Sequence, residues 1–454
     1  MTVLFAETAL LPGGWAADVR VVVADGRISS VTPNAAPNSP LSGQRLGCML
    51  PAPVNLHSHA FQRAMAGMTE RRGPTPDSFW TWRTLMYRFL DHLTPDDVQA
   101  IAAFQQMEML EAGYAGVAEF HYLHHQPGGA PYADLAEMSG RIVAAAKQSG
   151  IGLTLLPVLY EQGGCDGRAL AFGQLRFGND MERFARLWQA AAAHATGPDM
   201  VVGVAPHSLR AVSVAGFKAV ATLAPQAPVH LHIAEQVAEV AEVLDHHGAR
   251  PVEWLLANSP VDARWCLIHA TQMLPAETLA LAATGAVAGL CPITEANLGD
   301  GIFDGMRWLG AGGRFGVGSD SNVRISLTEE LRSLEYSQRL AGKGRAMFAS
   351  ADHSTGRVLF DGAVQGGAQA AGRQSGAIRV GDLADLLALD MGAVDLEGRQ
   401  GDDILDALIF AGDDRLVADV WSAGRHVVTR GQHVARDAIE AGYRRVMAGL
   451  RPKV

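Results

Sequence analysis

The sequence has little of three things that mark common classes of protein: cysteine, positive charge and long apolar runs. It contains only 4 cysteines in 454 residues, and they are scattered without the Cys-x-x-Cys spacing of a disulfide scaffold or a cysteine-bound zinc site. Acidic residues number 47 against 37 basic ones, so the formal net charge is -10. A nucleic-acid-binding surface is normally basic, and we therefore expect no nucleic-acid partner.

The longest apolar run is short and interrupted. It spans residues 278–294 and contains Gly285, Gly289 and Pro292, so it fits the end of a helix, a turn and a buried strand better than a membrane span. The first basic residue is Arg20, and no basic region precedes an apolar stretch at the start of the chain. We expect no membrane partner, no export signal and a cytoplasmic location.

The sequence is rich in apolar residues, and they recur in a regular alternation of strand-length and helix-length segments. Hydrophobic residues make up 48% and charged residues 19%, without a disorder signature. Over residues 50–372, apolar runs of strand length alternate with Ala/Leu/Glu-rich stretches of helical period, which predicts an α/β fold, a (β/α)₈ TIM barrel. The expected strands are Met49–Leu56, Gly116–Phe120, Gly152–Leu159, Val201–Ala205, Val229–Ile233, Trp265–Ile268, Ala286–Leu290 and Phe315–Gly318.

The two ends of the chain share a pattern that differs from that of the middle. Short strands separated by turns, such as Val19–Val23 and Val427–Thr429, occur in residues 1–49 and again in residues 373–454. Each end offers strands too short to make a convincing domain alone. We expect both ends to contribute to one small sheet layer beside the barrel.

Candidate metal ligands stand where the expected strands end. The first strand ends in His57-x-His59, and alternate residues of a strand point to one side, so the two imidazoles can converge on one ion. The fifth strand carries His232 near its end, with Glu235 just beyond it. A neutral imidazole binds Zn²⁺ well, and a nearby carboxylate can transfer protons. His230 shares a face with His232 but lies deeper, and we expect it to fill the barrel.

Two further polar residues follow later strands. The sixth strand ends at His269, and Asp320 follows the eighth. Alone, His269 could be a hydrogen-bonded core residue and Asp320 a helix cap. Taken together, ligand, acid and base types stand at the ends of strands one, five, six and eight, which is the face where TIM barrels carry their function. The joint pattern favours a catalytic site.

This constellation resembles the amidohydrolase superfamily over nearly the whole chain. The residues that match its metal and catalytic set are His57, His59, His232, His269 and Asp320. The terminal segments look like the small β-sandwich, built from both chain termini, that accompanies the barrel in that superfamily. The resemblance implies that His57, His59, His232 and Asp320 bind a divalent metal, with Zn²⁺ the first choice.

The number of metals follows from two features of the resemblance. His232 and Glu235 are similar to the His-x-x-Glu of the deaminase branch, where one divalent metal serves. Binuclear members bridge two metals with a carbamylated lysine at the end of a central strand. No lysine stands at an expected strand end, since Lys147 and Lys218 fall in helical stretches. We expect one metal ion per chain.

Loop motifs resemble one family of that branch, the formimino-L-glutamate deiminases of bacterial histidine degradation. The motifs are His57–Arg63, Ser78–Arg83, Glu119–His125 and Pro206–Arg210. That family converts N-formimino-L-glutamate and water to N-formyl-L-glutamate and ammonia. By its pattern, Gln62, Arg83 and Tyr122 would hold the α-carboxylate end, and His207 and Arg210 the side-chain carboxylate. The planar fork of arginine is matched to a carboxylate. We also expect a homodimer.

The expected chemistry is hydrolysis of an amidine-like C=N bond. Zn²⁺ lowers the pKa of its bound water toward ~7. We expect Asp320 to accept the proton of the attacking water and Glu235 to deliver a proton to the departing nitrogen. His269 would orient the water and stabilise the tetrahedral intermediate.

Two alternatives stay open from the sequence. A nucleobase or aminotriazine deaminase of the same superfamily would use the same metal set, with an aromatic-lined pocket instead of carboxylate clamps. A non-catalytic assembly protein on the same barrel should have lost metal ligands, whereas here the set is intact.

Overall fold

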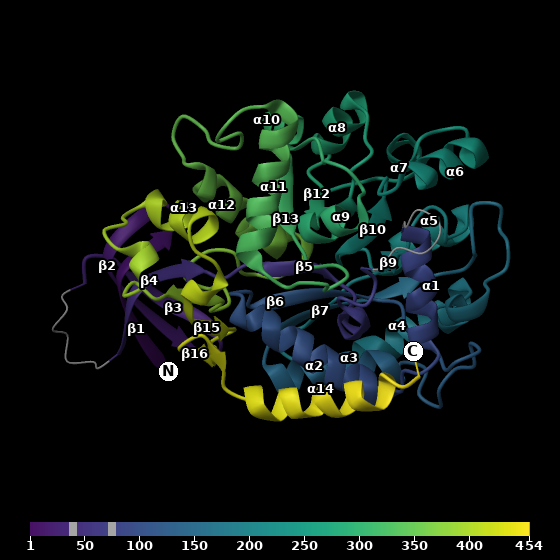
Figure 1. The fold of residues 1–454 in the computed structure, drawn as a ribbon, viewed down its shortest axis with the longest axis horizontal. Coiled ribbons are helices and arrows are strands. Elements are labelled where there is room, and N and C mark those ends of the chain that lie inside the picture. The colour runs from purple at the N-terminus through teal and green to yellow at the C-terminus, as the bar shows by residue number, and fades with distance from the viewer. Residues whose placement is uncertain (36–42, 71–78, 454) are drawn as a thin grey trace.

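The computed structural model describes residues 1–35, 43–70 and 79–453. It has a barrel of parallel strands surrounded by helices, and at one end of the long axis a sheet made of purple N-terminal and yellow C-terminal strands (Figure 1). The predicted fold class, a TIM barrel with a small sheet domain built from both termini, is confirmed.

Two parallel sheets form the barrel wall. Their orders are β5-β6-β7-β8, with β9 paired to β7, and β10-β11-β12-β13. Single bridges join the sheets, Val204 to Val229 on one side and Ser58 to Asp320 on the other. The barrel strands are β5 (Val54–Ser58), β6 (Gly116–His121), β7 (Gly152–Leu159), β8 (Val201–Val202), β9 (Ala205–Pro206), β10 (Val229–Ile233), β11 (Trp265–His269), β12 (Val287–Leu290) and β13 (Arg314–Val317).

Helices cover the outside of the barrel, so strands such as β7 and β10 are buried along their whole length. Parallel strands covered on both faces are expected to be mostly apolar, and the polar residues of these two are Thr154, His230 and His232. The covering helices are α1 (Phe79–Leu90), α2 (Pro95–Glu111), α3 (Glu137–Ser149), α4 (Met181–His194), α5 (Val214–Leu223), α6 (Val237–His247), α7 (Pro251–Asn258), α8 (Pro275–Ala282), α9 (Pro292–Leu298), α10 (Gly305–Gly310), α11 (Leu327–Gly342) and α12 (Thr355–Ala370).

The terminal sheet has the order β17-β16-β15-β14-β4-β1-β2-β3. The two ends of the chain meet where β4 pairs antiparallel with β14, Met49 opposite Ala388. A bridge from Arg27 to Leu383 brings the far edge back toward β14, so the sheet curls over an apolar core of its own. Its strands are β1 (Thr2–Leu11), β2 (Gly14–Ala24), β3 (Arg27–Thr32), β4 (Gln44–Pro51), β14 (Leu386–Leu389), β15 (Val417–Ser422), β16 (Arg425–Thr429) and β17 (Gln432–His433).

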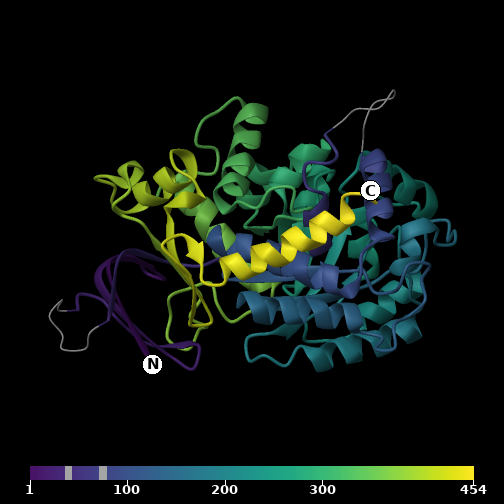
Figure 2. The same ribbon diagram turned by 60° about the horizontal axis from the view of Figure 1, so that its bottom comes forward.

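The C-terminal segment also returns to the barrel. Helix α13 (Asp402–Phe410) contacts α12, and α14 (Arg436–Leu450) lies along α2, as the yellow helix in Figure 2 shows. The rings of Tyr443 on α14 and Phe104 on α2 stack with their centroids 4.0 Å apart. No helix in the described ranges is both long and apolar enough to cross a bilayer.

Two expected strands differ in the structure. The segment Met49–Leu56 is not one strand, because its first residues end β4 in the terminal sheet and Val54 begins β5 in the barrel. Pro53 lies between them and has no N–H to give to a ladder. The expected strand Val201–Ala205 is divided into β8 and β9 around Gly203. The domain boundaries at residues 49 and 372 stay a prediction.

Candidate active site

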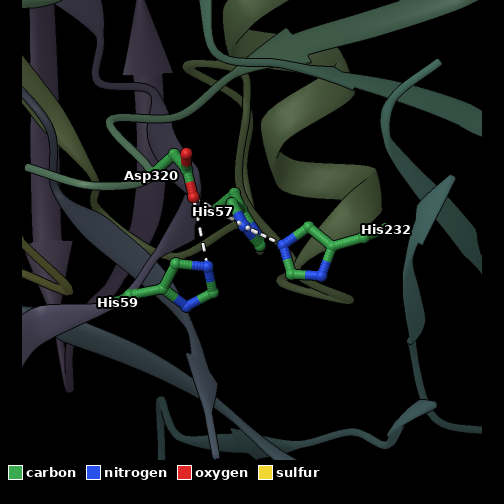
Figure 3. Close-up of side chains that lie close together, drawn as sticks. All are labelled: His57, His59, His232 and Asp320. Carbon is green, nitrogen blue, oxygen red and sulfur yellow. Dashed lines mark hydrogen bonds and ion pairs between the residues drawn. The ribbon is translucent and has the colours of Figure 1, made fainter. Parts of the chain in front are cut away.

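Three imidazoles and one carboxylate converge at the carboxyl ends of the barrel strands (Figure 3). His57 lies in β5 and His59 just after it, His232 lies in β10, and Asp320 follows β13. Nε2 of His57 lies 3.2 Å from Oδ1 of Asp320 and 3.0 Å from Nε2 of His232. Nε2 of His59 lies 3.1 Å from the same Asp320 oxygen. All four side chains are buried, with ligand atoms within 4.8 Å of one another.

Hydrogen bonds behind the rings fix which nitrogen faces the centre. Nδ1 of His59 lies 3.0 Å from the carbonyl oxygen of Phe120, and Nδ1 of His232 lies 3.2 Å from that of His207. A carbonyl oxygen only accepts, so each Nδ1 donates its hydrogen and leaves a lone pair on Nε2. Burial lowers the pKa of His57 to about 3 and that of His232 well below its usual value, which keeps both rings neutral. This donor set fits a divalent metal.

Backbone hydrogen bonds fix Asp320 between the two histidines of the first strand. Its N–H donates to the carbonyl oxygen of His57, and its own carbonyl accepts from the N–H of His59, both at 2.9 Å. The buried amide of Asn322 donates to the carbonyl oxygens of His59 and Asp320, each at 3.1 Å. Burial raises the pKa of Asp320, but the facing imidazoles of His57 and His59 outweigh burial and hold that pKa well below its usual value. The carboxylate is therefore ionised.

Glu235 and His269 lie beside this cluster. Oε1 of Glu235 is 3.9 Å from Nε2 of His269, whose Nδ1 is 3.3 Å from Oε1 of Glu295. Burial raises the pKa of Glu235, so this carboxyl can hold a proton nearer to neutral pH. Burial opposes the charge of His269, but Glu235, Glu295 and Asp320 surround it and raise its pKa to about 10. A protonatable carboxyl next to a cationic imidazole suits acid–base chemistry.

The backbone is strained where these strands end. Ala234 has φ 50°, His269 φ 70° and Asp320 φ 44°. Residues other than glycine rarely adopt positive φ, and such strain is concentrated at functional sites. The strained residues carry or adjoin the three side chains expected to transfer protons or orient water.

A cavity of about 680 Å³, its open mouth included, lies over the cluster. The five residues that the resemblance assigned to substrate binding all line it: Gln62, Arg83, Tyr122, His207 and Arg210. Glu235, His269 and Asp320 line the same cavity, together with His59 and His232. The structure thus brings the sequence-predicted residues to one place, with His57 beside them in the metal cluster.

Two guanidinium groups provide the positive charge of the cavity. Arg83 lies on α1 and its Nε donates to the hydroxyl of Tyr87. Arg210 lies in the loop after β9 and is only 7% exposed. Burial opposes its charge, but Tyr160 and the carboxylates of Glu239 and Glu235 face it and raise its pKa. Guanidinium groups of this kind can bind anionic groups of a ligand.

A neutral pair completes the polar lining. The amide nitrogen of Gln62 donates to the hydroxyl of Tyr122 at 2.7 Å. Its amide oxygen is buried and has no hydrogen-bond partner within the described residues. That oxygen can accept a hydrogen bond from an N–H group of a ligand.

The prediction that no lysine stands at the end of a barrel strand can be compared with the structure. Lys147 lies in α3 and Lys218 in α5, so no barrel strand in the described ranges ends in a lysine that could bridge two metals. The cluster of His57, His59, His232 and Asp320 is complete without one.

Comparison with known proteins agrees with this geometry. Residues 48–427 match the Amidohydrolase family, and residues 1–40 match the N-terminal domain of formimidoylglutamate deiminase HutF. A formimidoylglutamate deiminase from Pseudomonas aeruginosa is 48% identical, over 99% of this chain and 100% of that protein. The chain belongs to the formimidoylglutamate deiminase family of amidohydrolases.

Two solved structures resemble this chain over nearly its whole length. A crystal structure of an amidohydrolase from Brucella melitensis is 48% identical, with a TM-score of 0.96 over 99% of this chain and 100% of that one. A zinc-bound adenosine deaminase from Xanthomonas campestris has a TM-score of 0.83 over 99% and 98% of the chains. At 23% identity it shares the fold with this deiminase-family chain.

Sequence reasoning missed several residues of the site. Trp82, Tyr87 and Tyr160 line the cavity but were not among the expected site residues. Glu239 and Glu295 contact the segments that carry Glu235 and His269. An acidic residue in the first turn of a helix is an ordinary capping signal, so Glu239 in α6 and Glu295 in α9 each had only a weak signal. Ser78, the first residue of one loop motif, lies outside the described residues.

Proposed function

We propose that this protein hydrolyses N-formimino-L-glutamate to N-formyl-L-glutamate and ammonia, a step of histidine degradation. The observation that carries the proposal is one cavity that joins a complete metal-ligand cluster to two guanidinium groups, Arg83 and Arg210. The substrate has a hydrolysable C=N bond in its formimino group, an α-carboxylate next to that group and a side-chain carboxylate at the far end. The 48% identity to a formimidoylglutamate deiminase over the full chain supports the same reaction.

The metal in this proposal is a single Zn²⁺ ion. His57, His59, His232 and Asp320 would hold it, and a zinc-bound relative of the same fold supports the choice. When bound, such an ion lowers the pKa of water and polarises the bond under attack.

Substrate binding rests on the polar groups of the cavity. Arg83, with Gln62 and Tyr122, would bind the α-carboxylate end, and Arg210, with His207, the side-chain carboxylate. Burial lowers the pKa of His207 well below its usual value, so it binds as a neutral donor or acceptor. Arginine donates two parallel hydrogen bonds to a carboxylate, which fixes the orientation of the formimino group.

Three side chains would move or hold the protons. Asp320 accepts a proton from water as the water oxygen bonds to the formimino carbon and the C=N electron pair moves to nitrogen. Glu235 delivers a proton to that nitrogen, and the hydroxyl of the tetrahedral intermediate gives up the second proton, which Glu235 passes to the same nitrogen as the C–N bond breaks and ammonia leaves. The proton held by Asp320 then returns Glu235 to its acid form. His269 donates from Nε2 toward the oxygen and stabilises its developing charge. In net, two protons pass from water to ammonia, and the water oxygen becomes the formyl oxygen.

The nucleobase alternative has one feature in its favour. Aromatic rings, including Trp82, Tyr87 and Tyr160, also line the cavity. The guanidinium groups of Arg83 and Arg210 in the same cavity match carboxylates in geometry and charge, however, and an uncharged base offers them no negative charge. The carboxylate-bearing substrate fits the electrostatics better.

An ammonia-release assay tests the proposal. Purified protein supplied with zinc is incubated with N-formimino-L-glutamate and, separately, with cytosine, guanine and adenosine. We expect ammonia from the first compound alone, and Glu235→Gln protein as the control that releases little. Ammonia from a nucleobase and none from N-formimino-L-glutamate would contradict the proposal.

Assembly and location complete the proposal. We propose that the protein acts as a cytoplasmic homodimer, as expected from the sequence. Light scattering on the purified protein and fractionation of the source cells test the two statements.

A further inference from the structure

Glu239 is a buried carboxylate that accepts hydrogen bonds from the backbone next to and at Glu235, the proposed proton donor. It is the third residue of α6 and is 4% exposed. Its Oε1 accepts from the N–H of Ala234 at 3.1 Å, and its Oε2 accepts from the N–H of Glu235 at 2.9 Å. One side chain therefore satisfies two consecutive amides of the segment that carries Glu235 into the cavity.

That segment needs such support because its backbone is unusual. Ala234 has φ 50°, a conformation that residues with a Cβ rarely adopt. The carbonyl oxygen of Ala234 accepts from the N–H of Gln272 at 2.8 Å, so the turn is held from the far side as well. Without Glu239, two buried N–H groups would lose their acceptors, and the turn would relax. The direction of the Glu235 side chain follows from this turn.

The charge of Glu239 also has a function in the cavity. Glu239 lines the cavity together with Arg210 and Glu235. Burial raises its pKa, and the facing guanidinium of Arg210 is the largest influence in the opposite direction. A glutamine has one amide oxygen and could serve only one of the two N–H donors. A carboxylate serves both and balances part of the Arg210 charge.

We propose that Glu239 is a positioning residue, which holds Glu235 in the orientation required for proton transfer to the leaving nitrogen. It acts through the backbone of Ala234 and Glu235. The proposal rests on the proposed hydrolase function, because it assigns Glu239 to the same reaction.

A double-mutant cycle tests whether Glu239 acts through Glu235. The proteins are wild type, Glu239→Gln, Glu235→Gln and the double variant, with kcat, KM and bound zinc measured for each. We expect Glu239→Gln to lower kcat about 10-fold or more, with KM changed less than about 3-fold and zinc retained. In the Glu235→Gln background, the same change should lower kcat less than about 2-fold. Losses that multiply in the double variant, or an unchanged kcat in Glu239→Gln, would overturn the proposal.

Glu277→Gln is the matched control. Glu277 is likewise 4% exposed and the third residue of its helix, α8, and it accepts from the N–H of Leu274 at 2.6 Å. It lies outside the cavity lining. We expect this variant to melt earlier but to keep its kcat. An equal fall of kcat in Glu277→Gln and Glu239→Gln would mean general damage to a helix start, and the proposal would be wrong.

A conservative variant and a structure complete the test. Glu239→Asp keeps the charge but is one methylene shorter, so its kcat should fall between those of wild type and Glu239→Gln. A crystal structure of Glu239→Gln should show the Ala234–Glu235 peptide turned away from α6, and an undisturbed peptide would refute the role. This readout needs no turnover. Failure of wild type to release ammonia from N-formimino-L-glutamate would therefore reject the proposed function separately.

Discussion

Replacing Arg210 with methionine should weaken catalysis and also change which substrates are preferred. The side chain is 7% exposed and faces Glu239 and Glu235 across the cavity. Methionine keeps much of the length and the apolar stem but removes all five N–H donors. A substrate carboxylate bound there would lose its partner and would then face two acidic groups.

The expected magnitude follows from the lost bond and the remaining charges. A hydrogen bond to a charged group contributes about 1.5–3 kcal/mol. At about 1.4 kcal/mol for each factor of ten, its loss lowers kcat/KM by about 10- to 150-fold. Because Glu239 and Glu235 are no longer balanced by Arg210, we expect the upper part of this range. Metal content should not change, since Arg210 is not one of the four residues of the ligand cluster.

The assay compares two substrates. One is N-formimino-L-glutamate, and the other is its analogue with a methyl group in place of the side-chain carboxylate. Arg210→Met should bring their kcat/KM values closer together, whereas Arg83→Met should lower both and leave their ratio about the same. Arg168→Met is the control, because Arg168 also faces the acidic α6 through Glu242 but its side chain is 54% exposed. A wild-type kcat/KM in both Arg210→Met and Arg83→Met would refute the assignment of these arginines to the two carboxylates of the substrate.

Three other changes have definite outcomes. Glu235→Gln should lower kcat by about 10²-fold or more with metal retained, because the amide cannot cycle a proton, and near-normal turnover would move that role to His269. His57→Ala should reduce bound metal below one equivalent and remove most activity; metal analysis that finds two equivalents in wild type would contradict the single-ion site. The pKa of Asp199 is raised by burial but held below its usual 3.8 by Arg425, so its contribution to stability is present above pH 3.8 and is lost as the pH falls through the lower folded value. Asp199→Asn should therefore lower the melting temperature at pH 7 and flatten its decline in acid, and parallel acid melting curves for both proteins would show that Asp199 is not involved.

The fold was predictable because its strands are short, apolar and separated by long helices. The expected strand Val229–Ile233 coincides with β10, since all five residues are buried and the flanking segments are polar or turn-forming. The same property caused the error at Met49–Leu56. There the end of β4 and the start of β5 are both fully buried, so apolar periodicity cannot separate a strand of the terminal sheet from a strand of the barrel. Only Pro51 and Pro53 marked the division.

The metal cluster was accessible to sequence reasoning for a geometric reason, whereas the substrate-binding residues were expected only from the family resemblance. Parallel strands in a barrel end at one face, so His57, His232, His269 and Asp320 are brought together by topology, whatever the details of packing. No such rule applies to a side chain from a helix that folds back onto a strand end. Glu295 bonds to His269 only because α9 begins with a turn that returns its carboxylate to β11. That contact depends on tertiary structure alone.

The support given by these helices explains how the site keeps its strained backbone. Ala234, His269 and Asp320 all have positive φ, and each such residue costs about 1–3 kcal/mol. Together this is a large fraction of the roughly 5–15 kcal/mol that stabilises a typical domain. At each position a buried hydrogen bond compensates: Glu239 holds the amide of Ala234, Glu295 holds the ring of His269, and backbone bonds hold Asp320 to the first strand. The strain is local and the supports are specific, so removing one support should redirect one functional side chain before it unfolds the barrel. We therefore expect the orientation of the functional side chains to depend on the residues that hydrogen-bond to this strained backbone, such as Glu239 and Glu295, as well as on the metal ligands.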